Sequence, residues 1–206
     1  AIKIAKAPYM PKAELRNGIS LEAKNYFPFP VDESLLDFEI LGDIVEKGVR
    51  KYEVVVATSP VKIVNQYLSL LEKVGIKPSS FVPSSYALQK VVQELSTEEG
   101  KTQCFVDIGK LHTELTIFKG KDLLFSHKIP VAGDEFTRAM TGVLVSDRGR
   151  TELTIDEAEK IKQETGIPSE AEAKIIEGKI STTQVLSALR MPLEQLVSEI
   201  ERCFDY

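Results

Sequence analysis

The chain has 206 residues, of which 43% are hydrophobic and 28% are charged, the composition of an ordinary globular protein with one large or two small domains. Its net charge is −5 and it has no block of Lys and Arg, so nothing in the sequence favours a nucleic-acid partner. No apolar run approaches the ~20 residues needed to span a bilayer, and no signal peptide is visible.

The first 75 residues predict the order strand, helix, strand, strand, helix. Residues 1–7 alternate apolar and charged side chains, and apolar residues from Leu15 to Tyr26 then recur at helical spacing. Two strands follow, joined by a polar connection over 42–50. The second of them, 52–57, is nearly continuous in apolar residues and should lie deeper in the sheet. A helix with Ser59 as its cap completes this α+β unit.

The tetrapeptide Phe-Pro-Phe-Pro at 27–30 ends the first helix, because each proline moves the residue before it out of the helical region. Two interpretations are open. Either the phenylalanines fill the core, or the elbow forms a docking surface for a peptide.

Residues 76–83 predict a short strand, followed by an amphipathic helix capped at Ser84 or Ser85. The polar link at 97–100 is the clearest boundary in the chain.

The stretch from Cys104 to Thr137 carries the candidate chemistry. Its first strand ends in Asp107-Ile108-Gly109, two more strands follow, and a helix begins after Ala132-Gly133-Asp134. Glycine lets the backbone approach oxygen atoms, consecutive turn amides bind anions, and a carboxylate can orient a hydrated magnesium ion. The pattern therefore suits a phosphate and its metal ion, although strand-end aspartates also simply start turns.

After this stretch the sequence predicts a flexible loop over 143–153 and then a charged helix over 155–164. Thr154 and Glu157 have the spacing of a capping box at the start of that helix. Its charges are consistent with a solvated face. Apolar residues up to Phe204 predict a long last helix, which Pro192 either kinks or interrupts.

The cysteines and histidines of the sequence predict no reactive or metal-binding site. Cys104 and Cys203 both fall in apolar patterns, so we expect both thiols to be buried and reduced, as in a cytoplasmic protein. His112 and His127 have no partner at metal-ligand spacing, so the sequence predicts no zinc site.

Taken in order, these segments resemble the PilM family, cytoplasmic actin-like proteins of type IV pilus assembly, and more distantly the cell-division protein FtsA. The resemblance covers nearly the whole chain. It rests on the Pro-Phe-Pro elbow with Asp37–Gly42, on Val106–Gly109 with Thr113, on Ile129-Pro130 with Gly133 and Phe136-Thr137, on Glu159–Lys162, and on Glu199–Tyr206.

The resemblance implies a partial actin-like, ribonuclease H-like α/β fold. Residues 1–75 would form a small strand–helix–strand–strand subdomain. Residues 76–100 would return to the first actin-like lobe and link it onward, and residues 101–206 would form most of the second lobe.

The resemblance also implies a site for ATP and Mg²⁺ in the full-length protein. By similarity, Asp107 would orient the magnesium ion through water. The residues expected to contact phosphate or ribose are Gly109, Lys110, Thr113, Gly133, Glu159 and Lys162. No catalytic base is identified, so the resemblance leaves open whether the protein hydrolyses ATP.

Several features depart from the family pattern. Lys110 stands where relatives have a small residue, and Ala132 stands where they often have a glycine. The first phosphate motif would precede Ala1, and the glycine-rich adenosine motif would follow Tyr206. We therefore expect a fragment that on its own binds ATP weakly or not at all, carries no cofactor and has little ATPase activity.

The function implied is that of a scaffold on the cytoplasmic face of the inner membrane. It would bind the N-terminal tail of the membrane protein PilN within the pilus assembly complex, it could self-associate, and nucleotide would set the closure of its lobes. The alternatives are an FtsA-like filament protein, an ATPase or small-molecule kinase on the same fold, and an α/β domain that binds no nucleotide.

Overall fold

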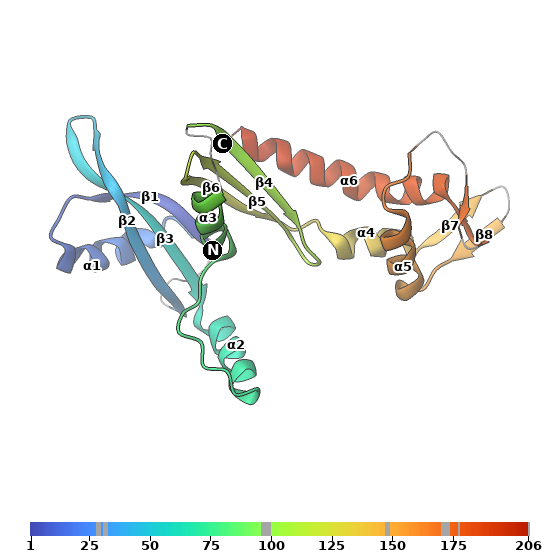
Figure 1. Ribbon diagram of the computed structural model, residues 1–206, viewed down its shortest axis with the longest axis horizontal. Coiled ribbons are helices and arrows are strands. Elements are labelled where there is room, and N and C mark those ends of the chain that lie inside the picture. The colour runs from blue at the N-terminus through green and yellow to red at the C-terminus, as the bar shows by residue number, and fades with distance from the viewer. Residues whose placement is uncertain are drawn as a thin grey trace. The chain divides into compact units, whose positions relative to one another are not determined.

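The computed structural model divides into two compact units, which are described one after the other (Figure 1). The first unit holds Ala1–Gln103 and Thr116–Ser126, and the second holds Cys104–Leu115 and His127–Tyr206. The residues described are 1–27, 30, 33–95, 100–146, 149–169, 174–176 and 178–205.

An antiparallel sheet in the order β1-β3-β2 forms the frame of the first unit. Its strands are β1 (Ile2–Pro8), β2 (Ser34–Glu46) and β3 (Val49–Pro60). The prediction of a deeper strand is confirmed, because β3 is central and Val54, Val55 and Val56 are all buried. In the edge strand β2, by contrast, half-buried and exposed residues alternate along the whole length.

The hairpin that joins β2 and β3 is longer than the sequence predicts. Instead of a polar connection over 42–50, the two strands pair until Glu46 meets Val49. The turn consists only of Lys47 and Gly48, both with positive φ, which is the backbone that a tight two-residue hairpin requires. The prediction was wrong because polar residues on an exposed edge strand resemble a loop.

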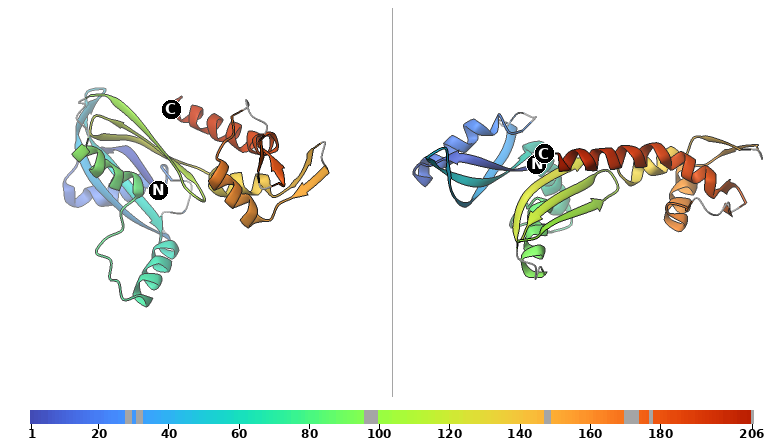
Figure 2. Two further views of the ribbon diagram at one scale, coloured as in Figure 1. Left: turned by 45° about the vertical axis from the view of Figure 1, so that its right-hand side comes forward. Right: turned by 90° about the horizontal axis from the view of Figure 1, so that it is seen from above.

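Helix α1 (Lys12–Ala23) packs on one face of this sheet (Figures 1 and 2). Three residues of the predicted stripe, Leu15, Ile19 and Ala23, are at most 1% exposed, whereas Tyr26 lies beyond the end of the helix and is half-buried. Phe27 joins the same core, as one interpretation of the elbow requires. Pro28 and Phe29 lie outside the described residues, so the docking interpretation is not tested.

Helices α2 (Val61–Lys73) and α3 (Ser84–Leu95) follow the sheet. The N-cap residue of α2 is Pro60 and not the predicted Ser59, and no side chain of the described residues caps this helix. The predicted strand at 76–83 is absent, because these described residues form no ladder. The predicted link at 97–100 lies outside the described residues apart from Gly100.

Three further strands form an antiparallel meander in the order β4-β5-β6 and contribute residues to both units. They are β4 (Thr102–Ile108), β5 (Thr113–Lys119) and β6 (Asp122–Ile129), as the sequence predicts. The prediction that both thiols are buried is half wrong. Cys203 is buried, whereas Cys104 is exposed because it lies on the open face of the edge strand β4.

The core of the second unit is built by helices α4 (Gly133–Met140), α5 (Ile155–Thr165) and α6 (Thr182–Phe204). Helix α6 continues through Pro192, so the proline does not start a new helix. The prediction of a flexible loop over 143–153 is wrong, because β7 (Val143–Ser146) pairs with β8 (Gly149–Glu152). A second short pair joins β9 (Ile175–Ile176) and β10 (Ile180–Ser181).

Candidate functional site

Two glycine-containing turns of the second unit meet through their backbones. The amide of Gly133 donates to the carbonyl of Gly109 at 3.0 Å, and the amide of Asp134 donates to the carbonyl of Lys110 at 2.9 Å. Within the first turn, the amide of Gly109 donates to the carbonyl of His112 at 3.2 Å. The turn after β4 is therefore joined directly to the start of α4, as a two-part phosphate loop would require.

Gly133 leaves little room for a side chain. A Cβ atom built there would lie 3.2 Å from the Gly109 carbonyl oxygen, 3.4 Å from Lys162 Nζ and 3.7 Å from Lys110 Cα. The glycine is thus required by the close approach of two backbones, with a lysine side chain alongside.

The two departures from the family pattern do not disturb this junction. Lys110 links the turn to α4 through its backbone carbonyl, which accepts from the Asp134 amide, and its side chain is exposed. Ala132 is the N-cap residue of α4, with φ of −159° and ψ of −166°, an extended conformation that any residue adopts. A lysine and an alanine are therefore compatible with the turns.

The start of α5 is fixed by the predicted capping box. Thr154 Oγ1 accepts from the Glu157 amide at 3.3 Å, and the Glu157 carboxylate accepts from the Thr154 amide at 2.9 Å. An ion pair from Lys179 also reaches Glu157. With its first turn held in this way, α5 packs on α4 through the buried Ala158 and Ile161.

Glu159 and Lys162 project from α5 onto the glycine junction. Lys162 Nζ donates to Glu159 Oε2 at 2.6 Å, to Thr137 Oγ1 at 2.9 Å and to the Gly133 carbonyl at 3.2 Å. The side chain of Lys162 is only 22% exposed. This pair is therefore more than the solvated face that its sequence also suggests, because it is tied into the turn.

The ammonium group of Lys162 is the main cause of the low pKa of Glu159. Its hydrogen bond, followed by those from the Thr137 hydroxyl and the Gln163 amide, lowers the pKa of Glu159 to about 2. At neutral pH the junction thus carries a carboxylate and an ammonium group side by side.

Asp107 and Thr113 differ in their exposure to solvent. Asp107 is exposed near the end of β4, two residues before Gly109. Thr113 is fully buried, and its hydroxyl donates to the Val131 carbonyl at 2.6 Å. This placement differs from the predicted direct phosphate contact, since Thr113 holds the segment before Gly133 from behind.

The residues present fit a phosphate group with a hydrated magnesium ion. In the described part of the chain, the amides of Lys110 and Leu111 have no hydrogen-bond acceptor, so they are available to an anion. Among the described residues, no three His, Cys, Asp or Glu side chains form a metal-binding group. A hydrated magnesium ion needs no such group, because it is commonly held by one or two carboxylates and by the phosphates themselves.

Thr137 is the site residue that its sequence position did not single out. It lies one turn after Gly133 in α4, is 3% exposed, and contacts both Glu159 and Lys162. Phe136-Thr137 is among the motifs of the resemblance, but it predicts no role for Thr137 at the site, because a hydroxyl residue four positions after a glycine is a spacing that many helices show by chance.

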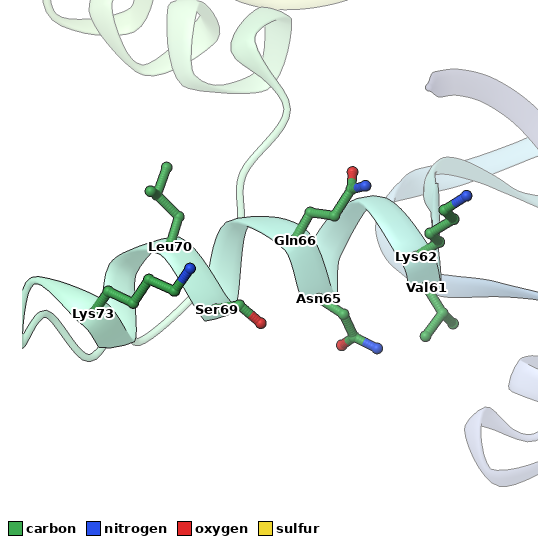
Figure 3. A pocket seen from close by; sticks show the side chains of 7 residues that line it. All are labelled: Val61, Lys62, Asn65, Gln66, Ser69, Leu70 and Lys73. Atoms are coloured by element: carbon green, nitrogen blue, oxygen red, sulfur yellow. The ribbon is translucent and has the colours of Figure 1, made fainter.

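A separate groove of about 840 Å³ runs along α2 in the first unit. Figure 3 shows seven side chains that line it, all from this one helix. They are Val61, Lys62, Asn65, Gln66, Ser69, Leu70 and Lys73. Of the residues in α2, only Val64 is buried. Among the exposed apolar residues of this helix, Val61 and Leu70 line the groove, whereas Ile63, Tyr67 and Leu68 do not.

Comparison with solved structures identifies the fold. The chain is similar to a PilM–PilN type IV pilus biogenesis complex with a TM-score of 0.73 and 24% identity, over 100% of this chain and 54% of that chain. It is also similar to MreB5 of Spiroplasma citri bound to ADP, with a TM-score of 0.54 and 17% identity, over 70% of this chain and 48% of that chain. MreB5 bound to AMPPNP gives the same TM-score and identity.

These similarities confirm a partial actin-like α/β fold. The chain spans about half the length of the solved chains that it matches. Among the helices that the structure describes, none has the length and apolar character needed to cross a bilayer.

The family model described as type IV pilus assembly protein PilM matches residues 3–194. Because this match covers far more than half of the sequence, the chain belongs to the PilM family of type IV pilus assembly proteins.

Proposed function

We propose that this protein is a nucleotide-binding scaffold of the type IV pilus assembly machinery. In the full-length protein, the glycine junction of the second unit would bind Mg-ATP, and the first unit would bind the N-terminal tail of PilN. The observation that carries the nucleotide proposal is the convergence of Gly109, Gly133, Glu159 and Lys162 in one hydrogen-bonded network.

Each group at the junction has a chemical task in this proposal. The amides after Gly109 and the Lys110 side chain would hold phosphate oxygens, and Asp107 would orient the magnesium ion through its water shell. Glu159 would accept a hydrogen bond from a ribose hydroxyl. Lys162 would donate one in exchange for its contact with the Gly133 carbonyl, which is the longest of its three at 3.2 Å. Thr113 would act indirectly, since its hydroxyl positions Val131.

The similar structures support this assignment, although their ligands are known only for those proteins. MreB5 of Spiroplasma citri was solved with ADP and with AMPPNP, which are the ligands of that protein. This chain shares its fold, and the residues that we propose as ligands meet in one place.

The magnesium role of Asp107 is tested by equilibrium dialysis of ATP with the full-length protein. We expect Mg²⁺ to strengthen ATP binding by the wild-type protein and to have little effect on Asp107→Ala. Asp122→Ala, which removes an exposed carboxylate from β6, is the matched control. Equal Mg²⁺ dependence in all three proteins would contradict the assignment.

A scaffold is distinguished from an enzyme by turnover. Phosphoryl transfer needs a base or a residue that orients water, and the described residues of the junction offer no group in such a position beyond the proposed ligands. We expect phosphate release from Mg-ATP by the full-length protein to match that of Asp107→Ala. Turnover that Asp107→Ala abolishes would identify an ATPase instead.

For PilN, we propose the groove along α2 as the docking surface. A PilM–PilN complex is similar to this chain over 100% of its length, which supports a PilN-like partner as a candidate. The groove offers the mixed surface that an extended peptide needs, with apolar contacts from Val61 and Leu70 and amide groups from Asn65 and Gln66. Membrane association would then follow through PilN.

The docking proposal is tested by fluorescence anisotropy with a labelled peptide of the PilN tail. We expect Leu70→Glu to weaken binding at least about tenfold, since it places a charge in the apolar part of the groove. Val74→Glu is the matched control, because Val74 is 64% exposed and does not line the groove. Full binding by Leu70→Glu, or no binding by the wild-type protein, would refute this docking surface.

A further inference from the structure

Thr137 joins the turn and the charged pair at the candidate site. Its Oγ1 lies 3.0 Å from the Gly133 carbonyl oxygen, 2.5 Å from Glu159 Oε2 and 2.9 Å from Lys162 Nζ. The residue is 3% exposed, so water competes little for these contacts. Three groups from α4 and α5 thus converge on a single hydroxyl.

The distances indicate which acceptor receives the hydroxyl hydrogen of Thr137. A threonine in a helix often donates to the carbonyl four residues earlier, which here is that of Gly133. The contact with Glu159 is 0.5 Å shorter than this back-bond (3.0 against 2.5 Å), and hydrogen bonds to carboxylates are the shorter and stronger kind. The single hydroxyl hydrogen therefore goes to Glu159, and the oxygen lone pairs accept from Lys162.

In this arrangement the short, rigid side chain of Thr137 restricts the long side chains of Glu159 and Lys162. Free Glu and Lys side chains have many rotamers, and fixing them when a ligand binds weakens the affinity. Thr137 is β-branched and buried, so its own rotamer is restricted. With this anchor in place, Glu159 and Lys162 are ordered before any ligand arrives.

We infer that Thr137 is a positioning residue, which holds Glu159 and Lys162 in the geometry that recognises the ribose of the nucleotide. The inference rests on the proposed nucleotide site and adds a residue to it. Thr137 acts through the pair and touches no phosphate. It therefore governs the nucleoside end of the ligand and leaves phosphate binding unchanged.

Calorimetric titration of the full-length protein with two ligands tests this role. Mg-ATP has both a ribose and phosphates, whereas magnesium tripolyphosphate has phosphates alone. We expect Thr137→Val to bind Mg-ATP about tenfold more weakly, the effect of losing one hydrogen bond to a charged group. Its affinity for magnesium tripolyphosphate should stay within about twofold of wild type.

Two further variants separate positioning from a structural effect. Thr137→Ser keeps the hydroxyl and should restore Mg-ATP affinity to within about threefold of wild type. Thr141→Val is the matched control, because Thr141 follows α4 and its hydroxyl donates only to the Arg138 carbonyl at 2.8 Å. Circular dichroism checks folding, and Thr137→Ala replaces the valine variant if valine unfolds the protein.

The outcomes distinguish this inference from the proposed function. Wild-type affinity for Mg-ATP in Thr137→Val, or an equal loss for both ligands, would overturn the positioning role and leave the nucleotide site intact. Absence of Mg-ATP binding by the wild-type protein would refute the nucleotide site itself, and the inference with it.

Discussion

At the residue scale, the candidate site is a set of close approaches rather than a cavity. Gly133 brings two turns together, and Lys162 joins the second of them to α5 through the Gly133 carbonyl. The resemblance to PilM proteins predicted both residues. Thr137 was not predicted as a ligand or anchor, because its role depends on how α4 packs against α5, which no local pattern in the sequence encodes.

The close approach at Gly133 predicts a severe effect of a single methyl group. In Gly133→Ala, the Cβ would press on the Gly109 carbonyl at 3.2 Å, and a backbone atom cannot yield as a side chain does. We expect the free energy of unfolding to fall by about 1–2 kcal/mol, measured by urea denaturation.

Gly142→Ala is the matched control for that experiment. No atom lies within 4 Å of a Cβ at Gly142, so its stability should stay within about 0.5 kcal/mol of wild type. Equal stability of Gly133→Ala and wild type would contradict the close approach of the two turns.

The ionised state of Glu159 predicts a dependence of stability on pH. Its pKa in the folded protein is lowered from 4.5 to about 2, chiefly by Lys162. A carboxylate with a depressed pKa stabilises the fold above its unfolded pKa, and this stabilisation is lost as pH falls from about 4.5 towards 2. Lys162→Met should therefore lose less stability over that interval than wild type does.

Urea denaturation at a series of pH values checks this expectation. Lys128→Met, which removes an exposed charge from β6, should retain the wild-type slope between pH 4.5 and 2. Identical slopes for Lys162→Met and wild type would show that the ammonium group does not hold the Glu159 carboxylate in its charged form.

At the element scale, predictions succeeded where a local signal fixes the structure and failed where pairing decides it. The capping box predicted the first residue of α5, and the pattern within 104–137 predicted the three strands β4, β5 and β6. The β7–β8 hairpin was predicted as a loop because its polar turn residues dominate a short segment, although Val143 and Val145 have strand propensity.

The capping box itself can be measured. Thr154→Ala removes the side chain that accepts from the Glu157 amide, so we expect thermal or chemical unfolding to show a loss of about 1 kcal/mol. Thr165→Ala, at the last residue of α5, is the control and should cost less than about 0.5 kcal/mol. Equal effects of the two changes would mean that the cap does not hold the helix.

At the scale of the whole molecule, the family and the fold were both predictable. The motifs occur in the order that the PilM family has, and this order is informative even though each motif alone is a weak signal. The PilM family match and the actin-like fold confirm that part. The binding partners are proposals, and the boundaries at 75 and 100 stay predictions. The chain spans about half of the solved chains that it resembles, so the full-length protein is the one to test.

If Lys162 belongs to a nucleotide site, its loss should weaken ATP binding. Calorimetric titration of Mg-ATP into the full-length protein measures this, with wild type, Lys162→Met and the control Lys128→Met side by side. We expect wild type and Lys128→Met to bind with equal affinity, and Lys162→Met to bind at least about tenfold more weakly, since it loses a charge-assisted hydrogen bond. Equal affinity of all three proteins, or no binding by wild type, would contradict this role of Lys162.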